Sequence, residues 1–341
     1  MVHMTGEQGA GKRVLHRSRS LEARALGAGC RVAVKNAVRA WALQPNLAWP
    51  LGSIDRIIGL VPGRLTASVR PVSLPGCPAE VVRARGASTR NAILYLHGGA
   101  FLTCGLNTHR ALAARLSAAA DAMVLNVGYR MLPTCGLTDA VDDALSGLAW
   151  LERSGYDPKR VVIAGDSAGG YLAFAAMLTS LARGVVPAAG LVALSPLIDL
   201  DPARKLAHHN IGRCSMFTGP ALSAFARLLR KSQCEGKLID PTTADLSGMP
   251  PVMIHVSEDE SLLVDSELVA ERLADADTPC ELHVWRGQIH DFPLAAEILP
   301  EGRRAIRYVG DFVKGVTSGA AAPATGRLRA GRLGYPAADA S

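Results

Sequence analysis

Short apolar runs alternate with longer amphipathic segments along most of the chain. The runs have the length and the β-branched content of strands. We predict strands over residues 65–74, 79–84, 92–97, 122–128, 161–164, 190–195, 251–256 and 280–285. Segments between them, such as 139–153 and 266–276, have helical spacing and are long enough for crossover helices. The pattern therefore predicts an α/β fold with a mostly parallel sheet that opens with a hairpin.

Three parts of the chain fall outside this alternation. Residues 17–60 and 203–245 are helical in pattern but do not fit the strand-helix repeat, so we expect both to lie above the sheet. Residues 318–341 are rich in Gly, Ala and Pro and have no periodicity, which predicts a flexible tail.

The composition is that of an ordinary globular protein, with 49% apolar and 20% charged residues. The length of 341 residues suits one large α/β domain with tails, or two smaller domains. No stretch approaches the ~20 apolar residues of a spanning helix. The polar, basic start lacks the apolar core of a signal peptide, so we expect a cytoplasmic protein. The seven scattered cysteines form no C-x-x-C pair, which predicts free thiols and no metal site.

The net charge of +7 is concentrated at the two ends of the chain. Residues 1–40 hold eight Lys or Arg against two Glu, and residues 303–341 hold seven basic against two acidic groups. Because aromatic residues are not interleaved with these charges, we expect no nucleic-acid partner. A solvated face explains the basic N-terminal helix; peripheral contact with an anionic membrane is the alternative.

A candidate nucleophile stands between a predicted strand and a predicted helix. The segment G-D-S-A-G-G, residues 165–170, follows the strand R-V-V-I-A and opens the run Y-L-A-F-A-A-M-L. A nucleophile on so tight a turn needs glycine on both sides, because a Cβ would clash where strand and helix come together. We therefore predict that Ser167 is a nucleophile at the carboxyl edge of the sheet. A glycine turn with an idle serine is the plain alternative.

A glycine-rich loop follows the strand N-A-I-L-Y-L and reads H-G-G-A-F, residues 97–101. Backbone N–H groups can reach a developing oxyanion only where the main chain is unobstructed. We therefore expect the amides of Gly98, Gly99 and Ala168 to form an oxyanion hole. His97 is expected to anchor the loop by hydrogen bonds.

A general base and an orienting acid are expected on the loops after the last two strands. His290 follows the final strand in G-Q-I-H-D-F, where it can reach the nucleophile. The preceding loop offers three carboxylates, Glu258, Asp259 and Glu260. The chain order serine, acid, histidine is that of α/β-hydrolases, but spacing does not choose among the three neighbours.

These motifs together resemble those of the bacterial hormone-sensitive-lipase-like esterases, the α/β-hydrolase fold-3 group. The resemblance is carried by H-G-G-A-F, Y-R-M-L-P, G-D-S-A-G-G, L-S-P-L-I-D-L and G-Q-I-H-D-F, and it covers roughly residues 65–315. It implies an α/β-hydrolase fold with an eight-stranded, mostly parallel sheet and a helical cap. The implied organisation is cap helices over 1–60, a catalytic domain over 61–317 with a cap insertion at about 203–245, and a tail over 318–341.

The resemblance also implies the chemistry. Ser167 falls on the family nucleophile, His290 on its base, and Gly98, Gly99 and Ala168 on its oxyanion donors. Laying residues 260–265 on the family motif D-P-L-x-D places Glu260 at the catalytic acid, with Asp259 next door as the alternative.

The implied activity is hydrolysis of short- to medium-chain carboxylic esters without metal or organic cofactor. A long-chain lipase or phospholipase, or a non-catalytic binding module on the same fold, are the alternatives. Apolar cap residues would line an acyl tunnel or support a homodimer contact. Those we expect in this part are Trp41, Trp49, Leu51 and Phe217.

Overall fold

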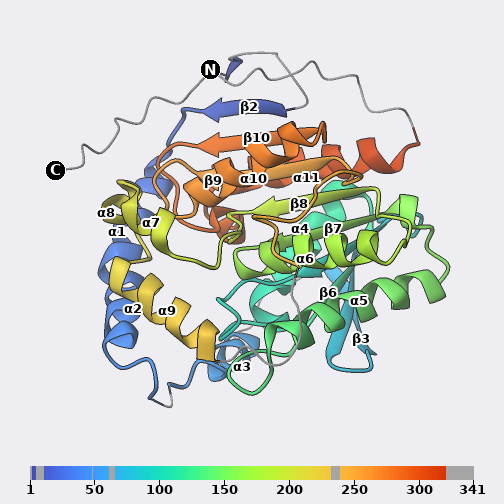
Figure 1. Cartoon of the computed structure of the whole chain (residues 1–341). Coiled ribbons are helices and arrows are strands. Elements are labelled where there is room, and N and C mark those ends of the chain that lie inside the picture. Colours follow the sequence, from blue (N-terminus) through green and yellow to red (C-terminus); the bar gives the residue numbers. More distant parts are fainter. Residues whose placement is uncertain (1, 5–10, 48, 61–65, 232–238, 320–341) are drawn as a thin grey trace.

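One ten-stranded sheet runs through the molecule, in the order β1-β2-β10-β9-β8-β7-β5-β6-β4-β3 (Figure 1). The computed structural model describes residues 2–4, 11–47, 49–60, 66–231 and 239–319. The strands are β1 Val2–Met4, β2 Gly11–His16, β3 Ala67–Ser73, β4 Pro78–Ala84, β5 Ala92–Leu96, β6 Met123–Val127, β7 Val161–Asp166, β8 Gly190–Leu194, β9 Val252–Ser257 and β10 Cys280–Trp285.

The predicted fold class is confirmed, but the described residues form ten strands instead of eight. All eight expected strands are present, and β3 and β4 form the expected antiparallel hairpin. The two additional strands lie within residues 1–60, where the sequence predicts cap helices. Strand β2 pairs in parallel with β10, and β1 pairs antiparallel with β2. The six residues of β2 include Lys12 and Arg13 and lack a strand-like apolar run, so their pairing with β10 was not visible locally.

Alternate side chains of the central strands enter two different cores, as expected for a sheet covered on both faces. On β5, Ile93 and Tyr95 belong to the core beneath one helical layer, whereas Leu94 and Leu96 belong to the other. The first layer holds α4 Leu106–Ala120 and α11 Pro300–Thr317, and the second holds α5 Leu137–Arg153, α6 Ala168–Ala182 and α10 Leu263–Asp275.

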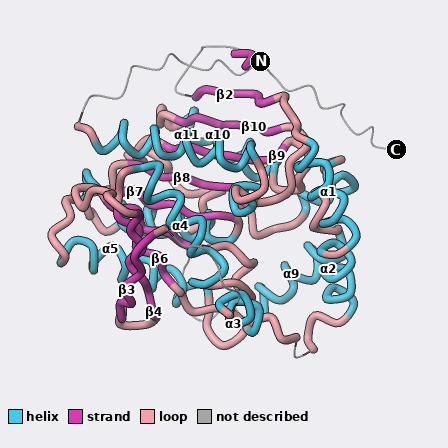
Figure 2. Tube along the Cα trace, turned by 180° about the vertical axis from the view of Figure 1, so that it is seen from behind, coloured by secondary structure: helices cyan, strands magenta, loops and turns pink. Residues whose placement is uncertain are grey.

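Two separate segments supply the helices that lie beside the carboxyl ends of the strands (Figures 1 and 2). From the N-terminal segment come α1 Leu21–Val32, α2 Val34–Leu43 and α3 Ser53–Gly59, and from the later insertion come α7 Ala203–Ala207, α8 Asn210–Arg213 and α9 Gly219–Lys231. Helices α2 and α9 contact each other although they are far apart in the chain. A short 3-10 helix, η1 Pro158–Arg160, precedes β7, and another, η2 Phe292–Ala295, precedes α11.

Some expectations fall on residues beyond the described ranges. The tail predicted over 318–341 lies outside them apart from Ser318 and Gly319, and so does Cys234. The other six cysteines are all free thiols. Among the described residues, no helix has the length and apolar character needed to cross a membrane.

Candidate active site

Ser167 occupies the sharp turn between β7 and α6, at the carboxyl edge of the sheet. Its backbone has φ +50° and ψ −117°, an unusual conformation for a residue with a side chain. The flanking glycines permit the turn. A Cβ on Gly165 would lie 2.2 Å from the Gly169 carbonyl oxygen, and one on Gly169 would lie 2.0 Å from the carbonyl oxygen of Leu96. The predicted need for glycine on both sides is therefore visible in the backbone itself.

His290 lies on the loop after β10 and faces the serine. Its Nε2 is 3.0 Å from Ser167 Oγ, within hydrogen-bonding distance. The ring of Phe217 approaches the imidazole edge-on, with centroids 4.8 Å apart. His290 and Ser167 are only 4% and 7% exposed, so the pair is shielded from bulk water. Of the sequence-predicted residues, these two are brought together as expected.

Glu260 is the carboxylate that reaches the far side of the imidazole. Its Oε2 is 2.5 Å from His290 Nδ1. Its Oε1 accepts hydrogen bonds from the Ser257 amide and the Ser195 hydroxyl, both at 2.7 Å. The Asp259 side chain makes no hydrogen bond or ion pair with any described residue, and it is partly exposed. The geometry therefore favours Glu260 over its neighbour.

The glycine-rich loop differs from the expectation at one position. The Gly98 amide already donates to Asp166 Oδ1 at 3.0 Å, so this N–H is not free to bind an oxyanion. The amides of Gly99, Ala100 and Ala168 make no hydrogen bond with the described residues, and Gly99 and Ala100 have φ of +115° and +56°. The free amides are thus one residue further along the loop than expected.

Asp166 is a structural residue that the sequence reading did not single out, although it stands inside the G-D-S-A-G-G motif. It accepts from Tyr95 Oη at 2.5 Å and from His109 Nε2 at 3.0 Å, in addition to the Gly98 amide. Burial by itself raises the pKa of Asp166, but the charge of His109 and these hydrogen bonds hold it below its ordinary value. A buried anion thus fixes the loop of Gly98 to the nucleophile turn.

His97 anchors the same loop from the other side. Its Nδ1 donates to the Gly98 carbonyl at 2.7 Å, and its ring stacks on Tyr129 with centroids 4.2 Å apart. Burial lowers the pKa of His97 to about 4, so the ring is neutral at pH 7. Its contacts are those of a loop anchor.

Asp291 is a second residue that the sequence reading did not single out, although it follows His290 directly. Its Oδ2 is 2.9 Å from His290 Nε2, on the same side of the ring as Ser167. Like its neighbours it is buried. The base is therefore in contact with a carboxylate at each of its two nitrogens.

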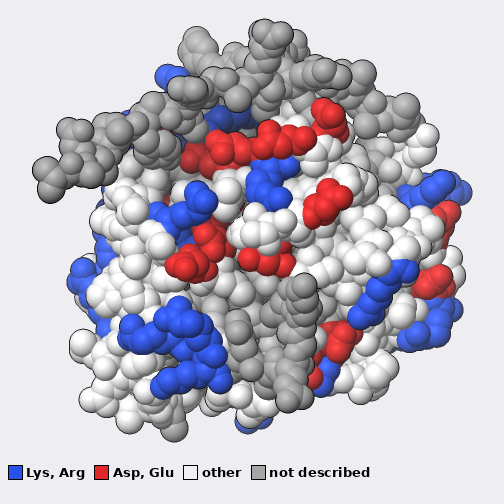
Figure 3. Space-filling view, viewed as in Figure 1, with Lys and Arg blue, Asp and Glu red and all other residues white. Residues whose placement is uncertain are grey.

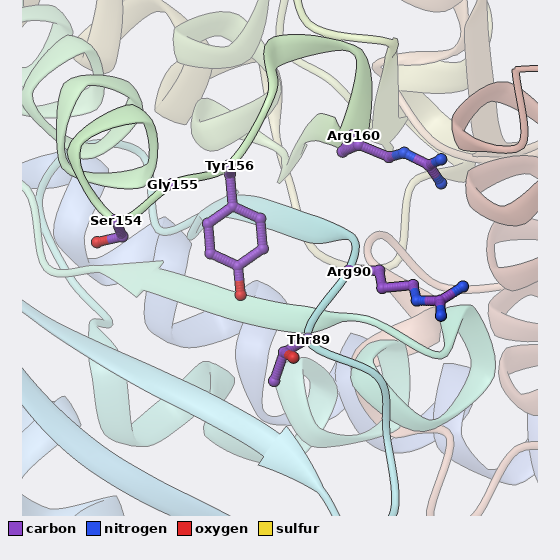
Figure 4. A pocket seen from close by; sticks show the side chains of 6 residues that line it. All are labelled: Thr89, Arg90, Ser154, Gly155, Tyr156 and Arg160. Carbon is purple, nitrogen blue, oxygen red and sulfur yellow. The ribbon is translucent and has the colours of Figure 1, made fainter.

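A surface hollow of about 520 Å³ lies at the opposite edge of the sheet (Figure 4). Arg90 and Arg160, which line it, come just before β5 and β7, whereas Ser167 follows β7. The hollow is therefore separate from the site that His290 forms with Ser167, Glu260 and Asp291. Its other lining residues are Thr89, Ser154, Gly155 and Tyr156.

Comparison with known proteins agrees with the fold. A family described as "alpha/beta hydrolase fold" matches residues 93–294. The esterase LipU of Mycobacterium tuberculosis is 42% identical over 297 residues, which is 84% of this chain and 100% of the relative. The chain therefore belongs to the alpha/beta hydrolase family and, within it, to the bacterial hormone-sensitive-lipase-like esterases.

Further relatives extend the comparison. The carboxylesterase/phospholipase LipF of Mycobacterium tuberculosis is 38% identical and covers 88% of this chain and 83% of its own. A crystal structure of EstE5 soaked with p-nitrophenyl butyrate has a TM-score of 0.76 at 29% identity, covering 88% of this chain and 100% of its own. An esterase of the bacterial hormone-sensitive lipase family gives 0.75 at 28% identity, with 87% and 98% covered.

Proposed function

We propose that this protein hydrolyses short- to medium-chain carboxylic esters through an acyl-enzyme formed on Ser167. That it is an ester hydrolase follows from its esterase and carboxylesterase relatives. One observation carries the assignment of the residues: His290 lies 3.0 Å from Ser167 Oγ through Nε2 and 2.5 Å from Glu260 through Nδ1. That arrangement suits a nucleophile, its base and an orienting acid.

The mechanism uses each contact in turn. His290 takes the Ser167 proton as Oγ attacks the ester carbonyl, and Glu260 stabilises the imidazolium that forms. The free amides of Gly99, Ala100 and Ala168 are the donors that support the tetrahedral oxyanion. His290 then gives its proton to the departing alcohol. Water attacks the acyl-enzyme by the reverse sequence and releases the acid.

Hydrolysis of p-nitrophenyl esters from acetate to palmitate tests the proposal. The expected result is greatest activity on short and medium acyl chains, with activity lost in Ser167→Ala because no covalent intermediate can form. A preference for palmitate would favour the lipase reading instead. Absence of turnover by the wild type on every ester would contradict the hydrolase assignment and favour the binding module.

The acid is tested by a matched pair of neighbours. Glu260→Gln removes the carboxylate beside Nδ1 and should lower kcat on the order of 10³- to 10⁴-fold, because the imidazolium loses its partner. Asp259→Asn changes a carboxylate that has no described partner, so we expect a wild-type rate. If the losses were reversed, Glu260 would not be the acid.

Aromatic residues of the cap support the preference for shorter acyl chains. Phe217 packs on His290, and Phe225 of α9 stacks on Phe101, with centroids 6.4 Å apart, next to the oxyanion loop. These rings place bulk close to the reacting atoms. Replacing Phe217 by Ala should move the optimum in the ester series toward longer chains. An unchanged optimum would show that Phe217 does not limit acyl length.

The surface of the cap also supports contact with an anionic membrane. Leu43, Ile57 and Leu60 are 83%, 59% and 82% exposed. Lys and Arg side chains gather over α9, which also belongs to the cap (Figure 3). A surface that combines exposed apolar groups with cations is typical of proteins that enter a lipid interface. The exposed cations on α1, α2 and α9 are Arg24, Arg31, Arg39, Arg227, Arg230 and Lys231.

Sedimentation with vesicles tests this contact. Wild type should bind vesicles that contain phosphatidylglycerol and not vesicles of phosphatidylcholine alone, with binding lost at high salt. Reversing Arg227, Arg230 and Lys231 to Glu should remove binding. Reversing Arg153 and Arg160, near the opposite edge of the sheet, should leave it unchanged. Equal sedimentation of both reversed proteins would contradict the proposal.

A further inference from the structure

The imidazole of His290 is bracketed by two carboxylates. Glu260 lies at Nδ1, and Asp291 Oδ2 lies 2.9 Å from Nε2. The same Nε2 is 3.0 Å from Ser167 Oγ. A serine triad needs only the carboxylate at Nδ1, so Asp291 is an additional group at the nitrogen that handles the proton.

The position of Asp291 is fixed by the network that fixes Glu260. Its amide donates to Ser195 Oγ at 3.2 Å, and the Ser195 hydroxyl donates in turn to Glu260 Oε1. Its backbone has φ +50°, and the side chain is only 9% exposed. Its Oδ1 is buried and has no hydrogen-bond partner among the described residues. Asp291 is therefore a buried, oriented carboxylate and not a solvated surface group.

At 2.9 Å, Oδ2 and an unprotonated Nε2 would face each other with lone pairs only and would repel, so this contact favours a proton on one of the two atoms. A neutral imidazole that donates from Nδ1 to Glu260 presents only a lone pair at Nε2. The pair of Asp291 and His290 therefore holds one proton, either as imidazolium or as carboxylic acid. In both forms the Nε2 lone pair is unavailable to Ser167, so this proton must leave to solvent before His290 acts as a base.

The surrounding charges favour the protonated pair. Burial lowers the pKa of His290, but the charges of Asp291 and Glu260 and their hydrogen bonds raise it well above its ordinary value. Burial raises the pKa of Asp291, and Asp166 raises it further, although His290 opposes both. The other titratable groups that interact with Asp291 are Tyr95, Cys104 and His109.

We infer that Asp291 is a positioning residue that sets the basicity of His290, holding the proton of the resting pair and stabilising the imidazolium formed when Ser167 attacks. The inference rests on the proposed ester hydrolysis and adds no bond to substrate. The proton balance is simple: one proton leaves the pair to solvent, Nε2 then accepts the proton of Ser167, and that proton departs with the alcohol.

The pH dependence of kcat/KM for p-nitrophenyl butyrate tests this role in Asp291→Asn. Asparagine keeps the size of the side chain and tolerates positive φ. The acid limb of the profile should move to lower pH by at least about one unit, because His290 loses a negative neighbour. The plateau rate should fall on the order of tenfold, because the imidazolium loses a partner. The control, Asp259→Asn, should keep the wild-type profile.

An unmoved acid limb, with or without a lower plateau, would overturn the inference and leave Asp291 a structural residue. If Asp291→Asn does not fold, proton NMR of the wild type decides. Imidazolium resonances of His290 that persist above pH 7 support the role, and titration at or below the ordinary histidine value contradicts it. This titration needs no turnover, so failure of the esterase assignment is distinguishable from failure of the inference.

Discussion

At the level of single residues, the site depends on close approaches between main-chain segments that only glycine permits. The turn that carries Ser167 exists because Gly165 and Gly169 have no Cβ, and the loop of Gly98 is held by a buried carboxylate, Asp166. The need for glycine is a local steric requirement, so it was predictable from the motif. The partner of the Gly98 amide was not, because Asp166 reaches that amide from another strand.

Substituting Gly169 by Ala tests the steric requirement. The added Cβ would lie 2.0 Å from the Leu96 carbonyl oxygen, so the strand or the helix must move. We expect a loss of about 1–3 kcal/mol in the free energy of unfolding, measured in urea, and a large loss of activity. Gly29→Ala in α1 is the control: its Cβ meets nothing within 4 Å, so stability should rise by about 0.5–1 kcal/mol. Equal effects would contradict the steric explanation.

At the scale of elements, a buried ion pair joins the cap insertion to the sheet. Lys205 of α7 is 2% exposed, and its Nζ lies 3.0 Å from Asp265 on α10. It also donates to the carbonyl of Asp199 at 2.6 Å. Asp265 accepts from the amides of Ile198 and Asp199 on the loop after β8. The Asp265 carboxylate therefore links three parts of the fold: α10, helix α7 of the cap and the loop after β8.

Removal of the Lys205 ammonium group should lower the free energy of unfolding strongly. Lys205→Ala leaves Asp265 buried without its charge partner, which typically costs about 3–5 kcal/mol. Urea unfolding measures the loss. The adjacent Arg204 has a side chain that is 61% exposed and makes only a 3.8 Å contact with Asp199, so Arg204→Ala should cost less than about 1 kcal/mol. Similar losses for both variants would show that burial of the pair does not matter.

At the scale of the whole molecule, the N-terminal strand extends the sheet and covers a group of buried rings. His16 of β2 stacks on Trp285 of β10 with centroids 3.7 Å apart, and its Nε2 is 3.0 Å from His283 Nδ1. His255 of β9 accepts a hydrogen bond from Trp285 Nε1 at 2.9 Å. Three histidines on three neighbouring strands are thus buried together, which ties the stability of this end of the sheet to pH.

The direction of this pH dependence follows because the buried histidines are neutral in the folded protein. Burial lowers the pKa of His16 to about 3, with further lowering by His283 and Arg304, and burial lowers that of His255 well below its ordinary value. Below pH 6.5, His16 and His255 bind protons in the unfolded chain, whereas in the folded chain they stay neutral until a much lower pH. The stability contribution is therefore complete above pH 6.5 and is lost as the pH falls toward 3, by about 2 kcal/mol for one histidine at pH 5.

Urea unfolding at pH 7 and pH 5 measures this loss. His16→Leu should lose less stability between the two pH values than the wild type does, because one buried neutral histidine is gone. The control His209→Gln changes an exposed histidine and should lose as much as the wild type. If all three proteins showed the same pH dependence, burial of His16 would not contribute.

The strand-helix alternation, the turn of Ser167 and the loop that carries His290 could be predicted from the residues alone. Each is written in a short stretch of chain, through side-chain period, steric need for glycine or order along the sheet. The folded chain was needed to show which of the neighbouring carboxylates lies beside His290, which amides stay free for an oxyanion, that β2 pairs with β10 and that Asp291 lies beside Nε2. Most of these contacts join groups that are far apart in sequence. The pattern of residues within one short segment therefore cannot predict which of the possible partners each group will contact.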